Sequence, residues 1–298
     1  MTGPLPPAPA HPRRLVYFGT PRMAVPTLEA LVAAGFDVAL VVTRIDKRRG
    51  RGNDLMPSPV KASAARLGLP VSHRVDDATE VGADLGVVVA FGQLIARPVL
   101  EQLPMVNLHF SLLPRWRGAA PVERAILAGD THTGVGVMRV EEGLDTGGLY
   151  AQAVVAVDDR SAAELRDELT TVGTALLLGA LRQGLAEPVP QVGEPLYARK
   201  IDSAELQIDW TRSAVEIARL VRLGMAWTTF RGRRLKVLDA VVASTDVGRS
   251  PGRVLERSVA TGEGSLDLVV VQPEGKAAMA AQAWINGARP GPEDRLGG

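Results

Sequence analysis

The stretch that decides the fold is residues 15–43, LVYFGTPRMAVPTLEALVAAGFDVALVVT. It begins with a short apolar strand candidate, Leu15 to Phe18, which the turn residues Gly19 to Pro21 end. Residues 25–34 then predict a helix, and Asp37 to Thr43 is a continuous Val-rich run of the kind that is buried on both faces of a sheet. Strand, helix and strand within this one stretch predict a βαβ unit and hence a parallel sheet.

A second strong strand candidate extends the same architecture. Residues 85–92, LGVVVAFG, are almost wholly apolar, and we expect them at the centre of the sheet. A long helix is predicted from the capping residue Ser161, with Glu164 at the capping-box position, to about Gln183. The whole pattern predicts an α/β fold with a Rossmann-like, doubly wound, mostly parallel sheet. The first turn lacks Gly-x-Gly-x-x-Gly, so we expect no dinucleotide cofactor.

Composition limits the class of protein. At 298 residues the chain is long enough for one large domain or two ordinary ones, and its net charge is only +1. Any contact with nucleic acid must therefore come from local basic patches. The absence of cysteine excludes disulfides and thiolate catalysis, and it fits a cytoplasmic protein. No apolar run approaches the ~20 residues of a membrane span, so we expect no membrane partner.

The composition changes after Gly184. Prolines and a glycine between residues 188 and 195 predict an extended connector. Beyond Trp210 come short β-rich pieces separated by turns, which predict a small β-barrel. We therefore expect a loose tail rich in Pro and Ala at residues 1–12, an α/β domain at 13–187, a linker at 188–209 and a smaller barrel domain at 210–298.

Asn107 and His109 are the leading candidates for a catalytic pair. Residues i and i+2 of an extended segment point to the same face, so both side chains should lie together at a strand end, where ligands of open α/β sheets bind. An amide can donate to a developing oxyanion, and an imidazole can carry a proton near neutral pH. Taken alone, an Asn-x-His on a strand is more often two polar groups satisfied near a turn.

Asp145 shifts that balance toward function. It lies among the glycines of residues 140–148, VEEGLDTGG, just after a strand candidate at 135–140. Glycines allow backbone conformations that would aim a carboxylate back at a site, where it would orient the imidazole of His109. We therefore predict that Asn107, His109 and Asp145 form a catalytic trio suited to acyl transfer, and that Phe91 and Gly92 form one wall of the ligand cleft.

Two basic segments could bind a polyanion. The first is residues 44–61, which is also rich in turn residues and carries Arg44, Lys47, Arg48, Arg49, Arg51 and Lys61 against Asp46 and Asp54. The second is a hairpin candidate that carries Arg231, Arg233, Arg234 and Lys236. From charge alone, a solvated surface is the better interpretation of the first and a protected sheet edge of the second.

Several motifs occur in the order that one family has them. The longest is HFSLLPRWRGAAP at 109–121, and the others are FGTP at 18–21, GRG at 50–52, LMPSPVK at 55–61 and GLDTGG at 143–148. With these motifs the chain resembles the folate-dependent formyltransferases over nearly its whole length, and among them the branch that formylates methionyl-tRNA. The resemblance also implies that the C-terminal barrel is an oligonucleotide-binding (OB)-like domain that binds tRNA.

The resemblance implies transfer of the formyl group of 10-formyltetrahydrofolate to the α-amine of methionine on initiator tRNA, without a metal. Asn107 and His109 would stabilise the oxygen of the tetrahedral intermediate, and Asp145 would set the charge state of His109 and relay the amine proton through water. The implied folate contacts are Ser111, Leu112, Leu113 and Pro114, beside the wall formed by Phe91 and Gly92. The implied tRNA contacts are Arg44, Lys47, Arg48, Arg49, Arg51, Arg231, Arg233 and Arg234.

Two other functions are considered. A formyltransferase for a small amine, such as a purine precursor or a sugar nucleotide, would carry the same trio, but the basic loop and the C-terminal region favour tRNA. A non-catalytic RNA-binding protein on the same scaffold belongs to a different class, and the intact trio disfavours it. We expect a monomer whose partners are initiator methionyl-tRNA and folate.

Overall fold

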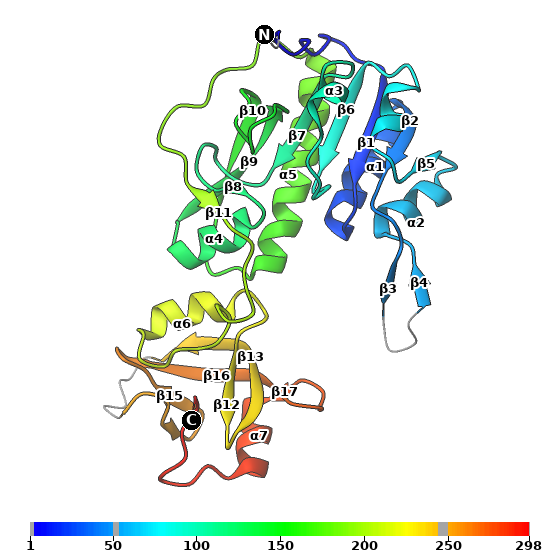
Figure 1. Ribbon diagram of the computed structural model, residues 1–298. Coiled ribbons are helices and arrows are strands. Elements are labelled where there is room, and N and C mark those ends of the chain that lie inside the picture. The colour runs from blue at the N-terminus through cyan, green and yellow to red at the C-terminus, as the bar shows by residue number, and fades with distance from the viewer. Residues whose placement is uncertain (1–2, 50–53, 244–249, 298) are drawn as a thin grey trace. The chain divides into compact units, whose positions relative to one another are not determined.

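The computed structural model describes residues 3–49, 54–243 and 250–297 (Figure 1). It divides into two compact units. Unit 1 consists of Met1–Pro121, His132–Ala156 and Arg166–Arg199. Unit 2 consists of Val122–Thr131, Val157–Leu165 and Lys200–Gly298. The domain boundaries expected from the sequence stay a prediction.

Unit 1 is built on a seven-stranded sheet in the order β10-β9-β7-β6-β1-β2-β5. The strands are β1 (Arg14–Gly19), β2 (Asp37–Val42), β5 (Val71–Ser72), β6 (Leu85–Val89), β7 (Met105–His109), β9 (His132–Arg139) and β10 (Leu149–Ala156). From β5 to β7 all neighbours pair in parallel, whereas β9 pairs antiparallel with both β7 and β10. The predicted mostly parallel, Rossmann-like sheet is confirmed, and the apolar β6 is its central strand, as expected.

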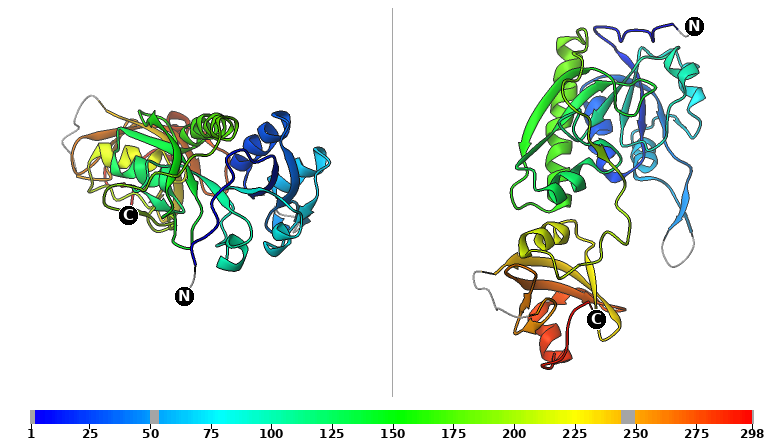
Figure 2. Two further views of the ribbon diagram at one scale, coloured as in Figure 1. Left: turned by 90° about the horizontal axis from the view of Figure 1, so that it is seen from above. Right: turned by 60° about the vertical axis from the view of Figure 1, so that its left-hand side comes forward.

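Helices cover both faces of this sheet, as a doubly wound fold requires (Figure 2). On one face α1 (Val25–Ala33) lies beside α5 (Ala162–Gln183), where the hydroxyls of Thr27 and Thr174 are 2.8 Å apart. On the other face, residues of η2 (Asp76–Thr79) and α3 (Arg97–Leu100) share a buried apolar cluster with β1 and β2. Within the described ranges, no helix is long and apolar enough to cross a membrane.

The ends of α5 agree with the sequence. Glu164 accepts from the backbone N–H of Ser161 at 2.8 Å, and its own N–H faces the Ser161 hydroxyl at 3.3 Å, so the predicted capping box is formed. The helix ends at Gln183, as predicted. The remaining elements of unit 1 are η1 (Arg22–Ala24), α2 (Pro59–Arg66), the hairpin β3 (Lys47–Arg49) with β4 (Asp54–Met56), and the parallel pair β8 (Arg117–Gly118) with β11 (Tyr197–Ala198).

The N-terminal residues, which we expect to form a loose tail, contact the rest of unit 1. Arg139 donates to the carbonyls of Leu5 and Pro6 at 2.7 and 3.2 Å. The N–H of Leu185 donates to the carbonyl of Ala10 at 2.8 Å. Pro lacks a backbone donor, but its carbonyl still accepts, so a proline-rich segment can be held by arginine side chains.

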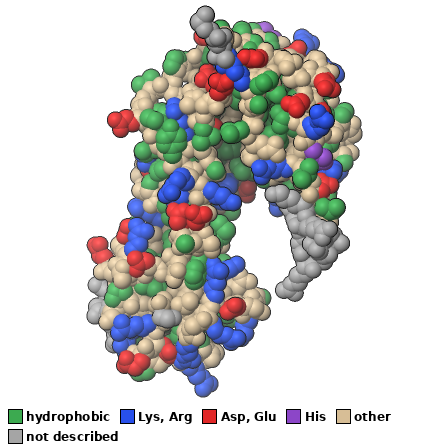
Figure 3. Space-filling model, in the orientation of Figure 1, with side chains coloured by type: hydrophobic (Ala, Val, Ile, Leu, Met, Phe, Trp, Pro, Cys, Tyr) green, Lys and Arg blue, Asp and Glu red, His purple; other side chains and the backbone are tan. Residues whose placement is uncertain are grey.

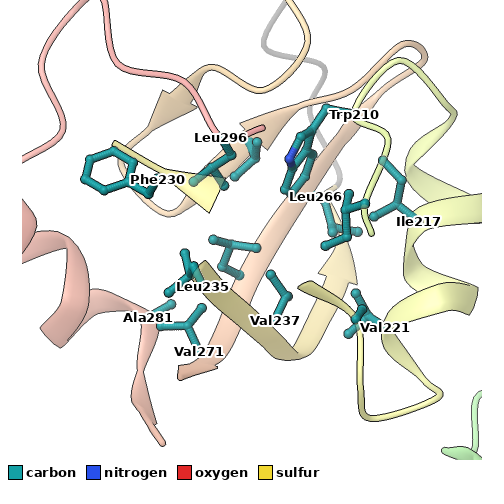
Figure 4. Close-up of a cluster of buried hydrophobic side chains, with 14 of the residues drawn as sticks. Trp210, Ile217, Val221, Phe230, Leu235, Val237, Leu266, Val271, Ala281 and Leu296 are labelled. Carbon is teal, nitrogen blue, oxygen red and sulfur yellow. The ribbon is translucent and has the colours of Figure 1, made fainter. Parts of the chain in front are cut away.

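Unit 2 contains an antiparallel sheet around one apolar core (Figure 4). Its strands are β12 (Trp227–Phe230), β13 (Arg233–Val242), β14 (Val254–Leu255), β15 (Ser258–Ala260), β16 (Ser265–Pro273) and β17 (Met279–Ala280). Its helices are α4 (Pro121–Ala128), α6 (Ala214–Val221) and α7 (Ala281–Ala288). Trp210 and Leu266 lie in the core, and the rings of Phe230 and Trp284 meet edge to face at 5.1 Å.

The C-terminal residues join the two ends of this sheet. The strands follow the order β12-β13-β16-β15-β14, so β12 and β14 are the outer strands of the path. Leu296 bridges to Phe230 of β12, and Arg295 bridges to Arg253, next to β14. The N–H of Leu296 also donates to the carbonyl of Gly252 at 2.8 Å. These bridges close the path, so the smaller C-terminal β-barrel domain is confirmed.

Candidate active site

The loops that follow the parallel strands of unit 1 are joined at the carboxyl edge of the sheet. Thr20, after β1, lies 3.5 Å from the backbone N–H of Arg44, after β2, and its hydroxyl donates to the carbonyl of Phe91, after β6, at 3.4 Å. The guanidinium of Arg44 donates to the carbonyl of Gly92 at 2.7 Å. The strand next to β6 is β7, so Asn107 and His109 lie toward the same carboxyl edge, where ligands of such sheets bind.

Asn107 is the more available member of the pair. It lies in β7 between buried neighbours and opposite Val88 of β6 and Met138 of β9. Its side chain is partly exposed, and within the described part of the chain it forms no hydrogen bond. An amide that is half-buried and without a protein partner can offer both its donors and its acceptor to a ligand.

His109 is 4% exposed and is held from both sides of its ring. Its Nε2 lies 2.9 Å from the carbonyl of Trp116, and its Nδ1 lies 3.5 Å from Oδ2 of Asp145. The two contacts orient the ring from both of its nitrogens. The contact with Asp145 is longer than an ordinary hydrogen bond.

Asp145 reaches His109 from a tightly folded loop, residues 141–148, which we call the Asp145 loop. Its Oδ2 also accepts from the backbone N–H of Gly118 at 2.8 Å. Asp145 has a φ of 53°, a left-handed conformation that is costly for a residue with a side chain. A Cβ on Gly147 would lie 2.0 Å from the carbonyl of Arg139, so only glycine fits there.

The structure thus brings Asn107, His109 and Asp145 to one edge of unit 1. Sequence reasoning missed Gln191, whose side-chain amide donates to the carbonyls of Asp145 and Gly147, both at 2.8 Å. Gln191 lies in the Pro-rich segment that the sequence identifies as a connector, and no motif marks it.

The segment predicted to contact folate follows β7 directly. Ser111 is fully buried, and its hydroxyl donates to the carbonyl of Arg115 at 2.6 Å, which agrees with a role in shaping the loop. Leu113 and Pro114 are buried and Leu112 is half-buried. Phe91 is only 3% exposed, and its ring packs on Phe18 at 5.5 Å, so its side chain belongs to the core and only its backbone can face a ligand.

The first basic segment folds as the β3–β4 hairpin, but only in part within the described residues. Lys47–Arg49 pairs with Asp54–Met56, whereas Arg51 lies outside the described residues. At the base of the hairpin, Nζ of Lys61 binds Oδ2 of Asp46 at 2.7 Å and lies 3.5 Å from Nε2 of His73. Lys61 therefore helps to hold the hairpin base.

The second basic cluster lies on β13 of unit 2 and on the turn before it. Lys and Arg side chains are visible on the surface of this unit (Figure 3). Arg233 and Lys236 are exposed, and the guanidinium of Arg234 lies 4.1 Å from the centre of the Trp227 ring. Arg231 differs, because it binds both carboxylate oxygens of Asp294, at 3.0 and 2.5 Å. The Arg231 guanidinium lowers the pKa of Asp294 to about 2.

Comparison with known proteins relates both units to one kind of enzyme. Residues 13–181 match the family model "Formyl transferase", and residues 200–289 match "Formyl transferase, C-terminal domain". The methionyl-tRNA formyltransferase of Symbiobacterium thermophilum is 43% identical over 300 residues, which cover 92% of each chain. The enzyme of the same name from Methylobacterium sp. is 43% identical and covers 95% of this chain and 99% of its own.

Solved structures show the same fold at low identity. An N-formyltransferase from Helicobacter canadensis superposes with a TM-score of 0.68 at 16% identity, covering 88% of this chain and 99% of its own. HypX from Aquifex aeolicus has a TM-score of 0.66 at 17% identity, covering 93% of this chain and 47% of its own.

Proposed function

The chain belongs to the methionyl-tRNA formyltransferase family, and on that premise we propose that it formylates the α-amine of methionine esterified to initiator tRNA, with 10-formyltetrahydrofolate as the donor. The observation that carries this proposal is the extent of the relationship, since relatives of that name are 41–44% identical over 92% or more of this chain. We place the reaction in the cytoplasm and expect the enzyme to act as a monomer, which light scattering in solution would test.

The trio supports this chemistry at the carboxyl edge of unit 1. The uncharged amine attacks the formyl carbon, and the formyl oxygen gains negative charge. The side-chain amide of Asn107 is a donor of the kind that stabilises such an oxygen. His109 is given the same role in the proposal, and one of its ring nitrogens would then exchange its contact with Trp116 or Asp145 for the oxygen. Asp145 orients His109 and can take the amine proton through water. The bond from the formyl carbon to the donor nitrogen then breaks, and that nitrogen receives a proton.

The segment after β7 is the proposed folate contact. Ser111 to Pro114 turn the chain immediately beyond His109, and the Gly92 backbone borders the same edge beside Arg44. A folate bound here would lie next to Asn107 and His109, as formyl transfer requires. Phe91 supports this wall from the core rather than by direct contact of its ring.

The two basic segments are the proposed tRNA contacts. A net charge of +1 cannot attract tRNA globally, so local cations must neutralise its phosphates. Arg44, Lys47, Arg48, Arg49 and Arg51 belong to the first segment, and Arg233 and Arg234 belong to the second. Arg231 also belongs to the proposed set, but its pairing with Asp294 supports a mainly structural role.

The test is formyl transfer from 10-formyltetrahydrofolate to charged initiator tRNA, beside charged elongator tRNA, free methionine and an amino-sugar nucleotide. We expect turnover on initiator methionyl-tRNA only. Preferred turnover of the amino-sugar nucleotide would favour the small-amine function. Binding of tRNA without any transfer would favour a non-catalytic RNA-binding protein.

A further inference from the structure

Gln191 is the one inward-facing residue of an otherwise exposed stretch. Of residues 189–196, only Gln191 is partly buried, and its neighbour Val192 is 87% exposed. The segment nevertheless follows unit 1 closely. Val189 pairs with Leu149 through two backbone hydrogen bonds of 2.8 and 2.9 Å, just after the Asp145 loop. Further along, β11 pairs in parallel with β8.

The Gln191 amide uses its whole hydrogen-bonding capacity inside unit 1. Its Nε2 donates to the carbonyls of Asp145 and Gly147, both at 2.8 Å. Its Oε1 accepts from Nε and one Nη of Arg117, at 3.1 and 2.6 Å. A primary amide has two donor hydrogens and two acceptor positions, so all four are satisfied. The surroundings therefore require a side chain that has both a hydrogen-bond donor and an acceptor at its end, as an amide has.

The Asp145 loop needs an external restraint of this kind. The left-handed backbone of Asp145 is strained, and such conformations persist only when surrounding contacts impose them. Gln191 donates to the carbonyls of residues 145 and 147, and it thereby restrains the turn that contains both residues. Because the Asp145 side chain lies 3.5 Å from His109, a small rotation of this turn would move the carboxylate out of reach.

Asp145 is held both by its side chain and by its backbone. Its carboxylate accepts from the backbone N–H of Gly118, and its carbonyl accepts from Gln191. Arg117, the residue before Gly118, holds the other end of the Gln191 amide. The four residues therefore form a closed ring of contacts that fixes both the backbone and the side chain of Asp145.

We propose that Gln191 is a positioning residue for formyl transfer, which acts by holding the Asp145 loop so that the carboxylate faces His109. The inference rests on the proposed function. Gln191 touches neither substrate nor reacting atoms in this role. Its effect on the reaction passes through Asp145.

The experiment compares Gln191→Ala and Gln191→Glu with the matched control Val192→Ala. Glutamate keeps the shape and the contact with Arg117, but it places an oxygen against the carbonyls of Asp145 and Gly147. We expect both Gln191 variants to lower kcat roughly 10- to 100-fold, as misplacement of a catalytic group does, with KM for tRNA and folate affinity changed less than about threefold. Val192→Ala should behave as the wild type.

A double-mutant cycle with Asp145→Asn separates positioning from general damage. If Gln191 acts through Asp145, adding Gln191→Glu to Asp145→Asn should lower kcat by less than about threefold further, since coupled residues are not additive. Full activity of Gln191→Glu, or losses that multiply in the double variant, would overturn the inference. An inactive wild-type enzyme would instead reject the proposed function itself. Thermal melting curves verify that each variant is folded.

Discussion

Asn107 and His109 lie two residues apart on β7, yet they differ in burial and in hydrogen bonding. His109 is buried, and both its ring nitrogens face acceptors, Trp116 and Asp145. Asn107 is half-exposed, and its side chain forms no hydrogen bond within the described ranges. The amide is therefore ready for a ligand as it stands, whereas the imidazole is a preorganised group whose position the protein has fixed before substrate arrives.

At this scale we predict that Asn107→Ala and His109→Ala each lower kcat roughly 10²- to 10³-fold, because each removes a side chain that the proposed mechanism uses to stabilise the developing oxyanion. Single-turnover formyl transfer to initiator methionyl-tRNA measures the effect. Asn286→Ala, an exposed change on α7, is the matched control. Near-normal turnover in either β7 variant would remove that residue from the proposed mechanism.

At the scale of elements, the main strands of the sheet and the long helix α5 followed from the sequence, and the contacts between distant loops did not. The apolar runs that became β2 and β6 are typical of strands buried inside a sheet, and Ser161 with Glu164 marks a helix start. Asp145 was predictable because its glycines signal a special turn. Gln191 was not, because its partners lie more than 40 residues earlier and its proline neighbours signal only extension.

The hairpin base gives a second prediction at this scale. Lys61→Met should free Asp46, whose other oxygen is already buried without a partner in the described residues, and so loosen the β3–β4 hairpin. We expect KM for tRNA to rise about fivefold, in line with about 1 kcal/mol for a partly exposed pair, with folate affinity unchanged. The control is Arg66→Met, on the same helix as Lys61, which breaks an exposed pair with Glu29 of α1. Equal KM values for both variants would contradict this role.

The barrel closure gives a pH prediction. Asp294 has its pKa lowered from 3.8 to about 2, chiefly by the hydrogen bond with Arg231. Its contribution to stability is therefore complete above about pH 4, and it is lost as the pH falls toward about 2. We expect the Tm advantage of the wild type over Asp294→Asn to shrink across that window. Glu293→Gln, an exposed neighbour, should show no such trend, and a constant advantage of wild type over Asp294→Asn would refute the linkage.

At the scale of the whole molecule, a nearly neutral chain must bind a polyanion through a few local cations. Replacing both Arg233 and Arg234 by Gln should weaken tRNA binding and reduce the log–log salt slope by up to about 1.4–1.8, which corresponds to two phosphates. The measurement is tRNA affinity from low to moderate salt. Arg257→Gln, an exposed cation paired with Asp267 in the same unit, serves as control. An unchanged slope would show that the β13 cations do not contact tRNA.

The path of residues 189–198 along unit 1 matters for hybrid enzymes that join the first part of this chain to the C-terminal part of a related enzyme. The family model for the first unit ends at residue 181, and a boundary near 187 is the one that the sequence favours. A crossover there would replace Gln191 and β11 together with the C-terminal unit. The Asp145 loop of the hybrid would then be held by a segment from another enzyme. Recombination after Arg199 keeps residues 189–198 with the Asp145 loop, so a C-terminal unit from a related enzyme could be joined there without changing the contacts of Gln191.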